Sequence, residues 1–313
     1  MSKTAFIFPG QGAQYCGMGQ DFYENTKTGK AIFDMASELL GFSVPELCFE
    51  KNDRLDITEY TQAAMVTASI AMMRVLEETK GVRPDVAAGL SLGEYPALAA
   101  AGVMSDADAI RTVRQRGILM QEAVPVGIGA MAAILALDAS KIEEVLSGID
   151  DVSIANYNCP GQIVISGRKE AVEEANAKLL EAGAKRAVML NVSGPFHSAM
   201  LAEAGRKLGE VLAGVTIHTP VIPYVANVTA QYVTKAEDVR PLLEKQVSSS
   251  VRWQQSVEAM LQDGVDTFIE IGPGKTLAGF MRKITRDVKV INIEKLEDIG
   301  SCLLYTSDAA DEL

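Results

Sequence analysis

The stretch Val86-Ala87-Ala88-Gly89-Leu90-Ser91-Leu92-Gly93-Glu94 decides the fold class of this 313-residue chain. Residues 86–89 form a short apolar run that is typical of a buried strand, and a helical pattern follows from 94 to 101. Between them, residues 89–93 read Gly-x-Ser-x-Gly, which predicts a tight strand-to-helix turn that exposes the hydroxyl of Ser91. The N-terminus of the following helix would face a developing oxyanion.

Outside this turn, strand-like runs alternate with helical patterns. The strand-like runs lie at 4–8, 86–89, 267–271 and 289–293, and helical patterns cover 63–80 and 106–123. This alternation predicts an α/β fold, a hydrolase-like, mostly parallel sheet flanked by helices.

The middle of the chain breaks the alternation. It reads strand (130–136), helix (140–147), strand (152–157), strand (162–166), helix (169–182) and strand (186–190), the β-α-β-β-α-β order of a ferredoxin-like unit. We therefore predict a discontinuous α/β hydrolase-like catalytic domain (1–126 plus 194–299), an inserted ferredoxin-like subdomain (127–193), and a substrate cleft between them. Residues 300–313 lack periodicity, and we expect a non-native or disordered tail.

Composition excludes several classes of protein. Hydrophobic residues make up 48% and charged residues 22%, a globular balance, and the longest uncharged apolar run (127–137) is far shorter than the roughly 20 residues of a membrane span. The net charge of −12 argues against nucleic acid as a partner. The four cysteines show no C-x-x-C pair and no export signal leads the first strand, so we expect free thiols and a cytoplasmic location.

A base for Ser91 must come from one of two histidines. His197 lies in a turn-rich loop, residues 193–198, where the inserted subdomain returns to the main domain, and this places it at the cleft. His218 precedes Thr219-Pro220 and is expected at an exposed strand end. Ser91 and His197 are therefore predicted to be nucleophile and base, with a structural histidine as the alternative for His197.

A series of blocks resembles the malonyl-CoA:acyl-carrier-protein transacylase family, shared with the acyltransferase domains of fatty-acid and polyketide synthases. The blocks are Phe8 to Gln14, Gly89 to Glu94, Arg116 to Gln121, Asn158 to Gln162, Pro195 to Ser198, Gln246 with Val251 to Trp253, and Ile271 to Gly274. They follow one another in the family's order and cover the chain to about residue 295.

The resemblance implies catalytic roles. Ser91 becomes acylated, His197 moves the proton, and the main-chain carbonyl of Gln246 orients the imidazole. The main-chain N–H groups of Gln11 and Leu92 form the oxyanion hole, with Gly10 and Gly12 giving Gln11 its backbone freedom. Without the family, Gln246 reads as a helix-surface glutamine.

The resemblance also implies a substrate. Arg116 holds the malonyl carboxylate, with Met120, Asn158 and Phe196 as further substrate-binding residues. Malonyl-selective members are similar to this chain at Phe196, whereas methylmalonyl-selective members have a smaller residue there. Many members have histidine where this chain has Leu90, which removes a polar contact near the acyl group. Two other arginines of the same helical pattern, Arg111 and Arg114, are expected on a solvated face.

The function implied is transfer of malonyl from malonyl-CoA to the phosphopantetheine thiol of acyl carrier protein, by a ping-pong mechanism, in fatty acid biosynthesis. We expect a monomer that needs no metal or bound cofactor. The alternatives are a trans-acting acyltransferase of a polyketide assembly line and a serine thioesterase or hydrolase, whose acid could be Asp150 or Asp151. A local positive patch is predicted to dock the carrier or CoA, with ordinary solvated charges as the alternative; its residues are Lys185, Arg186, Arg282, Lys283 and Arg286.

Overall fold

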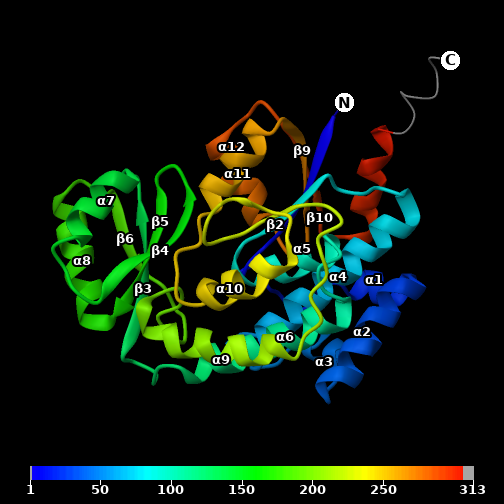
Figure 1. Cartoon of the computed structure of the whole chain (residues 1–313), viewed down its shortest axis with the longest axis horizontal. Coiled ribbons are helices and arrows are strands. Elements are labelled where there is room, and N and C mark those ends of the chain that lie inside the picture. The colour runs from blue at the N-terminus through cyan, green and yellow to red at the C-terminus, as the bar shows by residue number, and fades with distance from the viewer. Residues whose placement is uncertain (1, 306–313) are drawn as a thin grey trace.

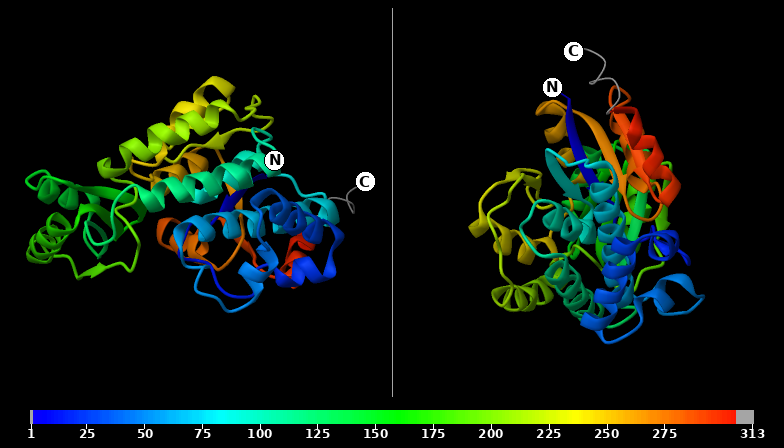
Figure 2. Two further views of the ribbon diagram at one scale, coloured as in Figure 1. Left: turned by 90° about the horizontal axis from the view of Figure 1, so that it is seen from below. Right: turned by 90° about the vertical axis from the view of Figure 1, so that its right-hand side faces the viewer.

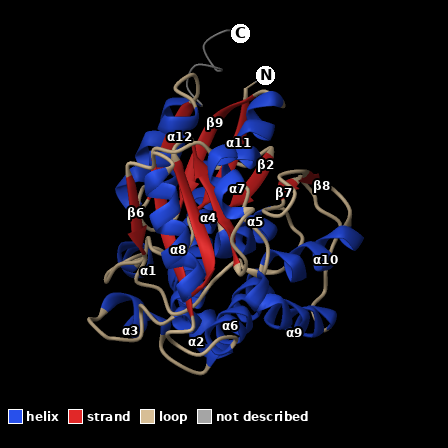
Figure 3. Cartoon of the chain, turned by 90° about the vertical axis from the view of Figure 1, so that its left-hand side faces the viewer, coloured by secondary structure: helices blue, strands red, loops and turns tan. Residues whose placement is uncertain are grey.

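The computed structural model describes residues 2–305, and the predicted tail at 306–313 lies outside the described residues. The chain forms a large lobe around a six-stranded sheet and a small lobe around a four-stranded sheet. The small lobe extends to one side of the large one in Figure 1 and in the left view of Figure 2, and it faces the viewer in Figure 3. Within residues 2–305, no helix combines the length and the apolar character that a membrane span requires.

The large sheet joins strands from both ends of the chain. Its strands are β1 (Lys3–Phe8), β2 (Val86–Gly89), β7 (Tyr224–Val225), β8 (Tyr232–Val233), β9 (Val265–Ile271) and β10 (Lys289–Ile293). They lie in the order β10-β9-β1-β2-β7-β8, and every neighbouring pair is parallel except β7 and β8. The predicted parallel sheet is confirmed, and the carboxyl ends of β1, β2 and β9 lie along one edge.

Helices cover both faces of this sheet because its central strands are apolar on both sides. Phe6 and Phe8 of β1 pack into one hydrophobic cluster, whereas Ala5 and Ile7 pack into another. The helices of the first cluster are α2 (Lys27–Leu40), α3 (Val44–Phe49), α4 (Thr58–Lys80), α5 (Glu94–Ala100), α6 (Asp106–Glu122), α9 (Ala202–Ala213) and α10 (Ala236–Gln246), with α1 (Gln20–Asn25) beside α2. Those of the second are α11 (Trp253–Gln262) and α12 (Thr276–Ile284).

Within the described part of the chain, three 3-10 segments complete the large lobe: η1 (Ser91–Gly93), η2 (Ala199–Leu201) and η3 (Leu296–Tyr305). The side chain of Ile299 is 5% exposed and packs into the first cluster. Because η3 continues past it to Tyr305, residues 300–305 belong to a 3-10 segment and are not disordered, whereas the expectation that the tail is non-native stays a prediction.

The small lobe forms from the middle of the chain. Its elements are β3 (Gly129–Leu135), α7 (Ala139–Leu146), β4 (Val152–Cys159), β5 (Gln162–Arg168), α8 (Lys169–Glu181) and β6 (Arg186–Met189), in the predicted order. The sheet is antiparallel and has the order β4-β5-β3-β6. Ile134 and Ile165 of this sheet pack with Ile142 of α7 and Val172 of α8, so the lobe has a core of its own.

Main-chain hydrogen bonds join the two lobes at the edge of the small sheet. The N–H of Val251 donates to the carbonyl of Ala155 at 2.8 Å, and the N–H of Tyr157 donates to the carbonyl of Val251 at 2.9 Å. Val251 lies between α10 and α11. The small lobe is therefore held against the segment that follows Gln246.

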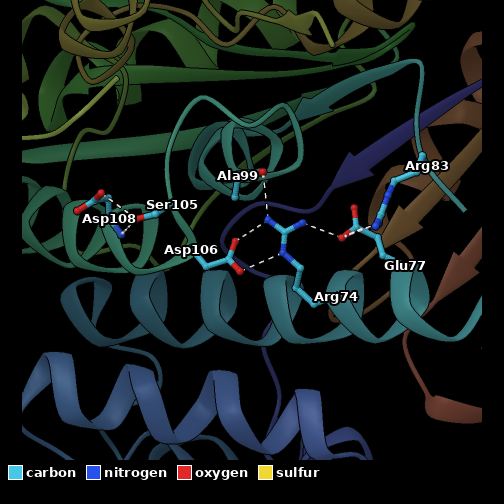
Figure 4. Close-up of polar contacts among 7 residues, drawn as sticks. All are labelled: Arg74, Glu77, Arg83, Ala99, Ser105, Asp106 and Asp108. Atoms are coloured by element: carbon cyan, nitrogen blue, oxygen red, sulfur yellow. Dashed lines mark hydrogen bonds and ion pairs between the residues drawn. The ribbon is translucent and has the colours of Figure 1, made fainter. Parts of the chain in front are cut away.

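Arg74 of α4 fixes the start of α6, the helix that carries Arg116 (Figure 4). Its Nε and Nη2 donate to the carboxylate of Asp106 at 3.0 and 2.7 Å, and Nη2 also donates to the carbonyl of Ala99 at 3.2 Å. Its Nη1 donates to Glu77 at 2.7 Å. This bidentate, largely buried arrangement ties α4, α5 and α6 together at one point.

Candidate active site

Ser91 occupies the turn between β2 and α5, and its backbone is in the left-handed region with φ of 56°. The two flanking glycines are required by close backbone contacts. A Cβ on Gly89 would lie 1.9 Å from the carbonyl oxygen of Gly93, and a Cβ on Gly93 would lie 2.3 Å from that of Phe8. The predicted elbow is therefore present, and it holds a partly exposed serine in strained backbone.

Asn227, which follows β7, clamps this turn from a distant part of the chain. Its Oδ1 accepts the N–H of Ser91 at 2.7 Å, and its Nδ2 donates to the carbonyl of Gly89 at 2.6 Å. The residue is 2% exposed. Both bonds are made away from water, so the asparagine fixes the backbone on either side of Leu90.

His197 meets the serine hydroxyl. Ser91 Oγ and His197 Nε2 are 2.8 Å apart, and His197 Nδ1 lies 2.8 Å from the main-chain carbonyl oxygen of Gln246. A carbonyl can only accept, so Nδ1 carries the proton and Nε2 is left to accept from the hydroxyl. The imidazole thus has the tautomer of a base toward Ser91. His197 itself has φ of 59°, so both partners are in strained backbone.

The surroundings of His197 keep the imidazole neutral. Burial lowers its pKa to about 4, and the charge of Arg116 acts in the same direction. The hydrogen bond to the carbonyl of Gln246 opposes this effect. At neutral pH the ring is therefore unprotonated at Nε2 and can take the proton of Ser91.

Arg116 is buried beside the serine. Its side chain is 1% exposed, and its Nη2 donates to Ser91 Oγ at 3.0 Å. Nη1 donates to Oε1 of Gln62 at 2.6 Å, while Nε and Nη2 donate to Oε1 of Gln246 at 3.2 and 2.9 Å. A guanidinium held by neutral amides keeps its full charge available for an anion at this point.

A cleft of about 920 Å³ opens between the lobes at Ser91. Met120 and Phe196 line it from the large lobe, Asn158 lines it from the small lobe, and Leu90 lines it beside Ser91. Asn158 Oδ1 has no hydrogen-bond partner among residues 2–305. The structure therefore places three of the four predicted substrate-binding residues in one cavity with the serine, and the fourth, Arg116, contacts Ser91 Oγ from behind the cleft lining.

Gln11 lies in the loop after β1, next to the turn after β2, since β1 and β2 are neighbouring strands. Leu92 follows Ser91 directly within η1, so its N–H lies beside the serine hydroxyl's turn, as the predicted oxyanion hole requires. Gly12 has φ of 103°, as expected for a loop that turns its backbone. Gly10 serves a different purpose, because a Cβ there would lie 2.5 Å from Cδ2 of Leu90.

The structure corrects two expectations about side chains. Gln246 is 0% exposed, so its reading as a surface glutamine is wrong, and its side chain contacts Arg116 directly. Arg114 is also not on a solvated face: it pairs with Glu59 at 2.7 Å and lies over the ring of Tyr60. Arg111 is exposed and pairs with Asp108, as expected.

The predicted docking residues lie outside the cleft lining. Lys185 and Arg186 are exposed at the start of β6, and Lys283 of α12 donates to Gln162 of β5 at 3.1 Å. Arg282 and Lys283 line a separate hollow at the end of α12, together with Arg286. Since Leu135 pairs with both Arg186 and Gln162, the two groups of cations lie at the same end of the small sheet.

Three site residues were missed by reasoning from the sequence: Gln62, Asn227 and Glu94. Glu94 Oε2 accepts from Gln246 Nε2 at 2.7 Å and from the main-chain N–H of Asn227 at 3.3 Å. The only available signal was the position of Glu94 directly after the elbow. Gln62 and Asn227 lie in unremarkable sequence, and only the fold brings them to the serine.

The candidate acids of a hydrolase triad lie away from His197. Asp150 and Asp151 are exposed in the small lobe, where Asp151 pairs with Arg168 at 3.5 Å, and the Nδ1 of His197 is already occupied by a carbonyl. His218 is exposed in the loop before β7.

Comparison with known proteins gives one consistent result. The family model for the acyl transferase domain matches residues 5–302. The chain is 46% identical over 304 residues to the malonyl CoA-acyl carrier protein transacylase of Bacillus subtilis (strain 168), covering 96% of both chains. It is 44% identical over 304 residues to the protein of the same name from Staphylococcus aureus (strain MRSA252), covering 96% of this chain and 98% of that one.

Solved structures agree over the whole fold. The malonyl CoA-acyl carrier protein transacylase from Clostridium perfringens superposes with a TM-score of 0.94 at 40% identity, covering 98% of each chain. A malonyl-transacylase solved in complex with its type II polyketide acyl-carrier protein gives a TM-score of 0.92 at 41% identity, covering 97% of this chain and 99% of that one.

Proposed function

The chain belongs to the acyl transferase domain family, and from that premise we propose that it transfers the malonyl group of malonyl-CoA to the phosphopantetheine thiol of acyl carrier protein, in fatty acid biosynthesis. The observation that supports malonyl as the acyl group is the contact between Arg116 and Ser91, 3.0 Å from Nη2 to Oγ. A buried cation beside the nucleophile favours an acyl group that ends in a carboxylate.

In the first half-reaction Ser91 Oγ attacks the thioester carbonyl carbon while its proton passes to His197 Nε2. The negative oxygen that forms is received by the N–H groups of Gln11 and Leu92. Collapse breaks the C–S bond, and the CoA sulfur leaves with the proton from His197. The products are malonyl-Ser91 and free CoA, with the malonyl carboxylate on Arg116.

The second half-reaction runs the same steps in reverse with a new thiol. His197 takes the proton of the carrier's phosphopantetheine thiol, the sulfur attacks the ester carbonyl, and Ser91 leaves with the proton returned by His197. Asn158, with its unpartnered Oδ1, is suited to accept an amide N–H of the pantetheine arm. Neither half-reaction requires a metal or a bound cofactor.

We also propose a cytoplasmic location and docking of the carrier on the cationic end of the small sheet. Three described cysteines (Cys16, Cys48, Cys159) are free thiols, which suits a reducing compartment. The docking proposal is supported by the position of Lys185 and Arg186 on the same end of the sheet as Lys283, in a protein whose net charge is −12.

A polyketide carrier is a second candidate acceptor, because one of the matched structures contains such a carrier with its malonyl-transacylase. The chemistry at Ser91 is the same for both carriers. Testing the protein against fatty-acid and polyketide carriers in parallel would rank them by kcat/KM.

The test of the function is to identify the acylated residue and its acceptor. The protein is mixed with labelled malonyl-CoA, digested and examined by mass spectrometry, and holo acyl carrier protein is then added; Ser91→Ala is the control. We expect label on Ser91 that moves to the carrier thiol much faster than to water. Label elsewhere, equal labelling by acetyl-CoA, or release to water alone would overturn the proposal.

A further inference from the structure

Glu94 is a buried carboxyl group, 1% exposed, that the proposed reaction does not use. It is the first residue of α5, directly after the elbow. Its Oε2 accepts from the side chain of Gln246 at 2.7 Å and from the backbone of Asn227 at 3.3 Å. Both donors belong to residues that hold the reacting groups, since Asn227 clamps Ser91 and Gln246 contacts Arg116 and His197.

Only one orientation of the Gln246 amide satisfies its neighbours. Its Nε2 faces two acceptors, Glu94 Oε2 and the carbonyl oxygen of Ser91, the latter at 2.9 Å. Its Oε1 faces two donors of Arg116, at 3.2 and 2.9 Å. A half-turn of the amide would set NH₂ against the guanidinium and oxygen against oxygen, and all four hydrogen bonds would be lost.

We propose that Glu94 is a positioning residue for substrate selection, acting through Gln246 on Arg116. By accepting from Nε2 it keeps Oε1 of Gln246 turned toward the guanidinium, and that oxygen holds Nη2 against Ser91 Oγ. The inference rests on the proposed malonyl transfer and deepens it, because it names the residue behind the specificity-determining arginine. Loss of the acceptor should therefore reduce transfer of malonyl and spare transfer of an uncharged acyl group.

The role requires an acceptor oxygen and not a negative charge. Burial raises the pKa of Glu94 to about 7, with the bond from Gln246 and the charge of Arg116 acting against it. A protonated carboxyl group still has a carbonyl oxygen that can accept from Nε2. The other ionisable groups that interact with Glu94 are Tyr95 and Tyr224, whose pKa values are raised by burial, so both stay neutral. Glu94→Gln keeps an acceptor, whereas Glu94→Met fills similar space without one.

The first experiment compares kcat/KM for malonyl-CoA and acetyl-CoA, measured as acylation of Ser91, in the wild type, Glu94→Gln and Glu94→Met. We expect the malonyl-to-acetyl ratio to fall at least tenfold in Glu94→Met and to stay within about threefold of wild type in Glu94→Gln. A ratio unchanged in Glu94→Met would reduce Glu94 to a structural role. Equal losses in both variants would contradict the acceptor mechanism.

The second experiment asks whether the effect passes through Arg116. In an Arg116→Ala background, Glu94→Met should change the ratio no further, because the group that it positions is gone. An equal change in both backgrounds would overturn the proposal. If Glu94→Met does not fold, Gln246→Met is the substitute, because it removes the side-chain amide that contacts Arg116 and keeps the main-chain carbonyl that contacts His197. It must show the same fall in the malonyl-to-acetyl ratio.

A matched control is Glu270→Met. Glu270 is also a buried carboxyl group, but it accepts from the N–H groups of Leu277 and Ala278 at the start of α12. It should lower stability without changing the acyl ratio. Failure of the wild type to transfer malonyl at all would count against the proposed function, and it is distinguishable from any result on Glu94.

Discussion

Nη2 of Arg116 donates to Oγ of Ser91 at 3.0 Å, so the charge that we assign to substrate selection touches the atom that attacks the substrate. A three-carbon malonyl group attached to Oγ has its free carboxylate only a few bonds away. The guanidinium therefore needs to move little to exchange the hydroxyl for a carboxylate, and this relationship leads to the first prediction.

Arg116→Ala should lower kcat/KM for malonyl-CoA by about 30-fold or more, because breaking a buried charge-assisted contact costs about 2 to 5 kcal/mol. Acetyl-CoA makes no such contact, so its transfer should be unchanged or faster. Acylation kinetics with the two thioesters check this. Arg111→Ala, on the exposed side of the same helix, is the control, and parallel losses for both substrates in Arg116→Ala would show a structural role only.

The second prediction concerns the pH dependence of acylation. Since burial and Arg116 lower the pKa of His197 to about 4, the neutral base persists well below neutral pH. We expect kcat/KM to stay nearly constant from pH 8 to 5.5, whereas a histidine at its ordinary pKa of about 6.5 would lose about tenfold over this range. In Arg116→Ala the acidic limb of the pH profile of kcat/KM should move to higher pH, because a cation that repels protonated His197 is removed. An inflection near pH 6.5 in the wild type would refute the lowered pKa of His197.

The third prediction tests the clamp on the elbow. Asn227→Ala removes the acceptor for the N–H of Ser91 and the donor to Gly89, so we expect kcat to fall about 10- to 100-fold for malonyl and acetyl alike. The malonyl-to-acetyl ratio should not change, in contrast to Glu94→Met. Asn227→Asp, which keeps the acceptor oxygen, should recover part of the loss. A ratio that shifts would show that Asn227 also acts on Arg116.

The fourth prediction concerns the shape of the acyl pocket. Phe196 is 7% exposed and lines the cleft next to His197. Phe196→Ser should raise the preference for methylmalonyl-CoA over malonyl-CoA by about 10-fold or more, because steric selection of one methyl group is worth about 1 to 3 kcal/mol. Competition between the two thioesters measures the ratio, and Phe196→Tyr, which keeps the ring, is the control. No change in Phe196→Ser would mean that another residue limits the pocket.

The fifth prediction concerns stability. Burial raises the pKa of Glu270 from 4.5 to about 7, although the amides of Leu277 and Ala278 favour its charged form. Because the pKa of Glu270 is higher in the folded state than in the unfolded state, its protonation contributes to the free energy of unfolding. This contribution is fully present below pH 4.5 and is lost as pH rises through 7. Thermal unfolding of the wild type should therefore show a Tm that declines from pH 5 to 8, and the decline should be smaller in Glu270→Gln. An equal slope in both proteins would contradict it.

Local patterns in the sequence predicted much of the fold. The glycines around Ser91, the alternation of strands and helices, and the change of order after residue 129 are encoded within a few neighbouring residues, because backbone sterics and side-chain period are local. The pairing of Ser91 with His197 could be predicted because the chain has only two histidines. One of them, His197, lies in the loop that returns from the inserted subdomain to the main domain. The role expected for the backbone of Gln246 came from a resemblance and not from local pattern.

The amide of Gln246, the carboxyl group of Glu94 and the clamp by Asn227 came only from the tertiary structure. Asn227 and Ser91 are 136 residues apart, and Gln246 and Glu94 are 152 apart. Hydrogen bonds across such distances leave no period or turn in the sequence, since the partners meet only after the sheet and both lobes have assembled. Short motifs around Ser91 and His197 thus indicated the type of chemistry, whereas the orientation of Arg116 toward Ser91 depends on buried polar contacts that exist only in the folded chain.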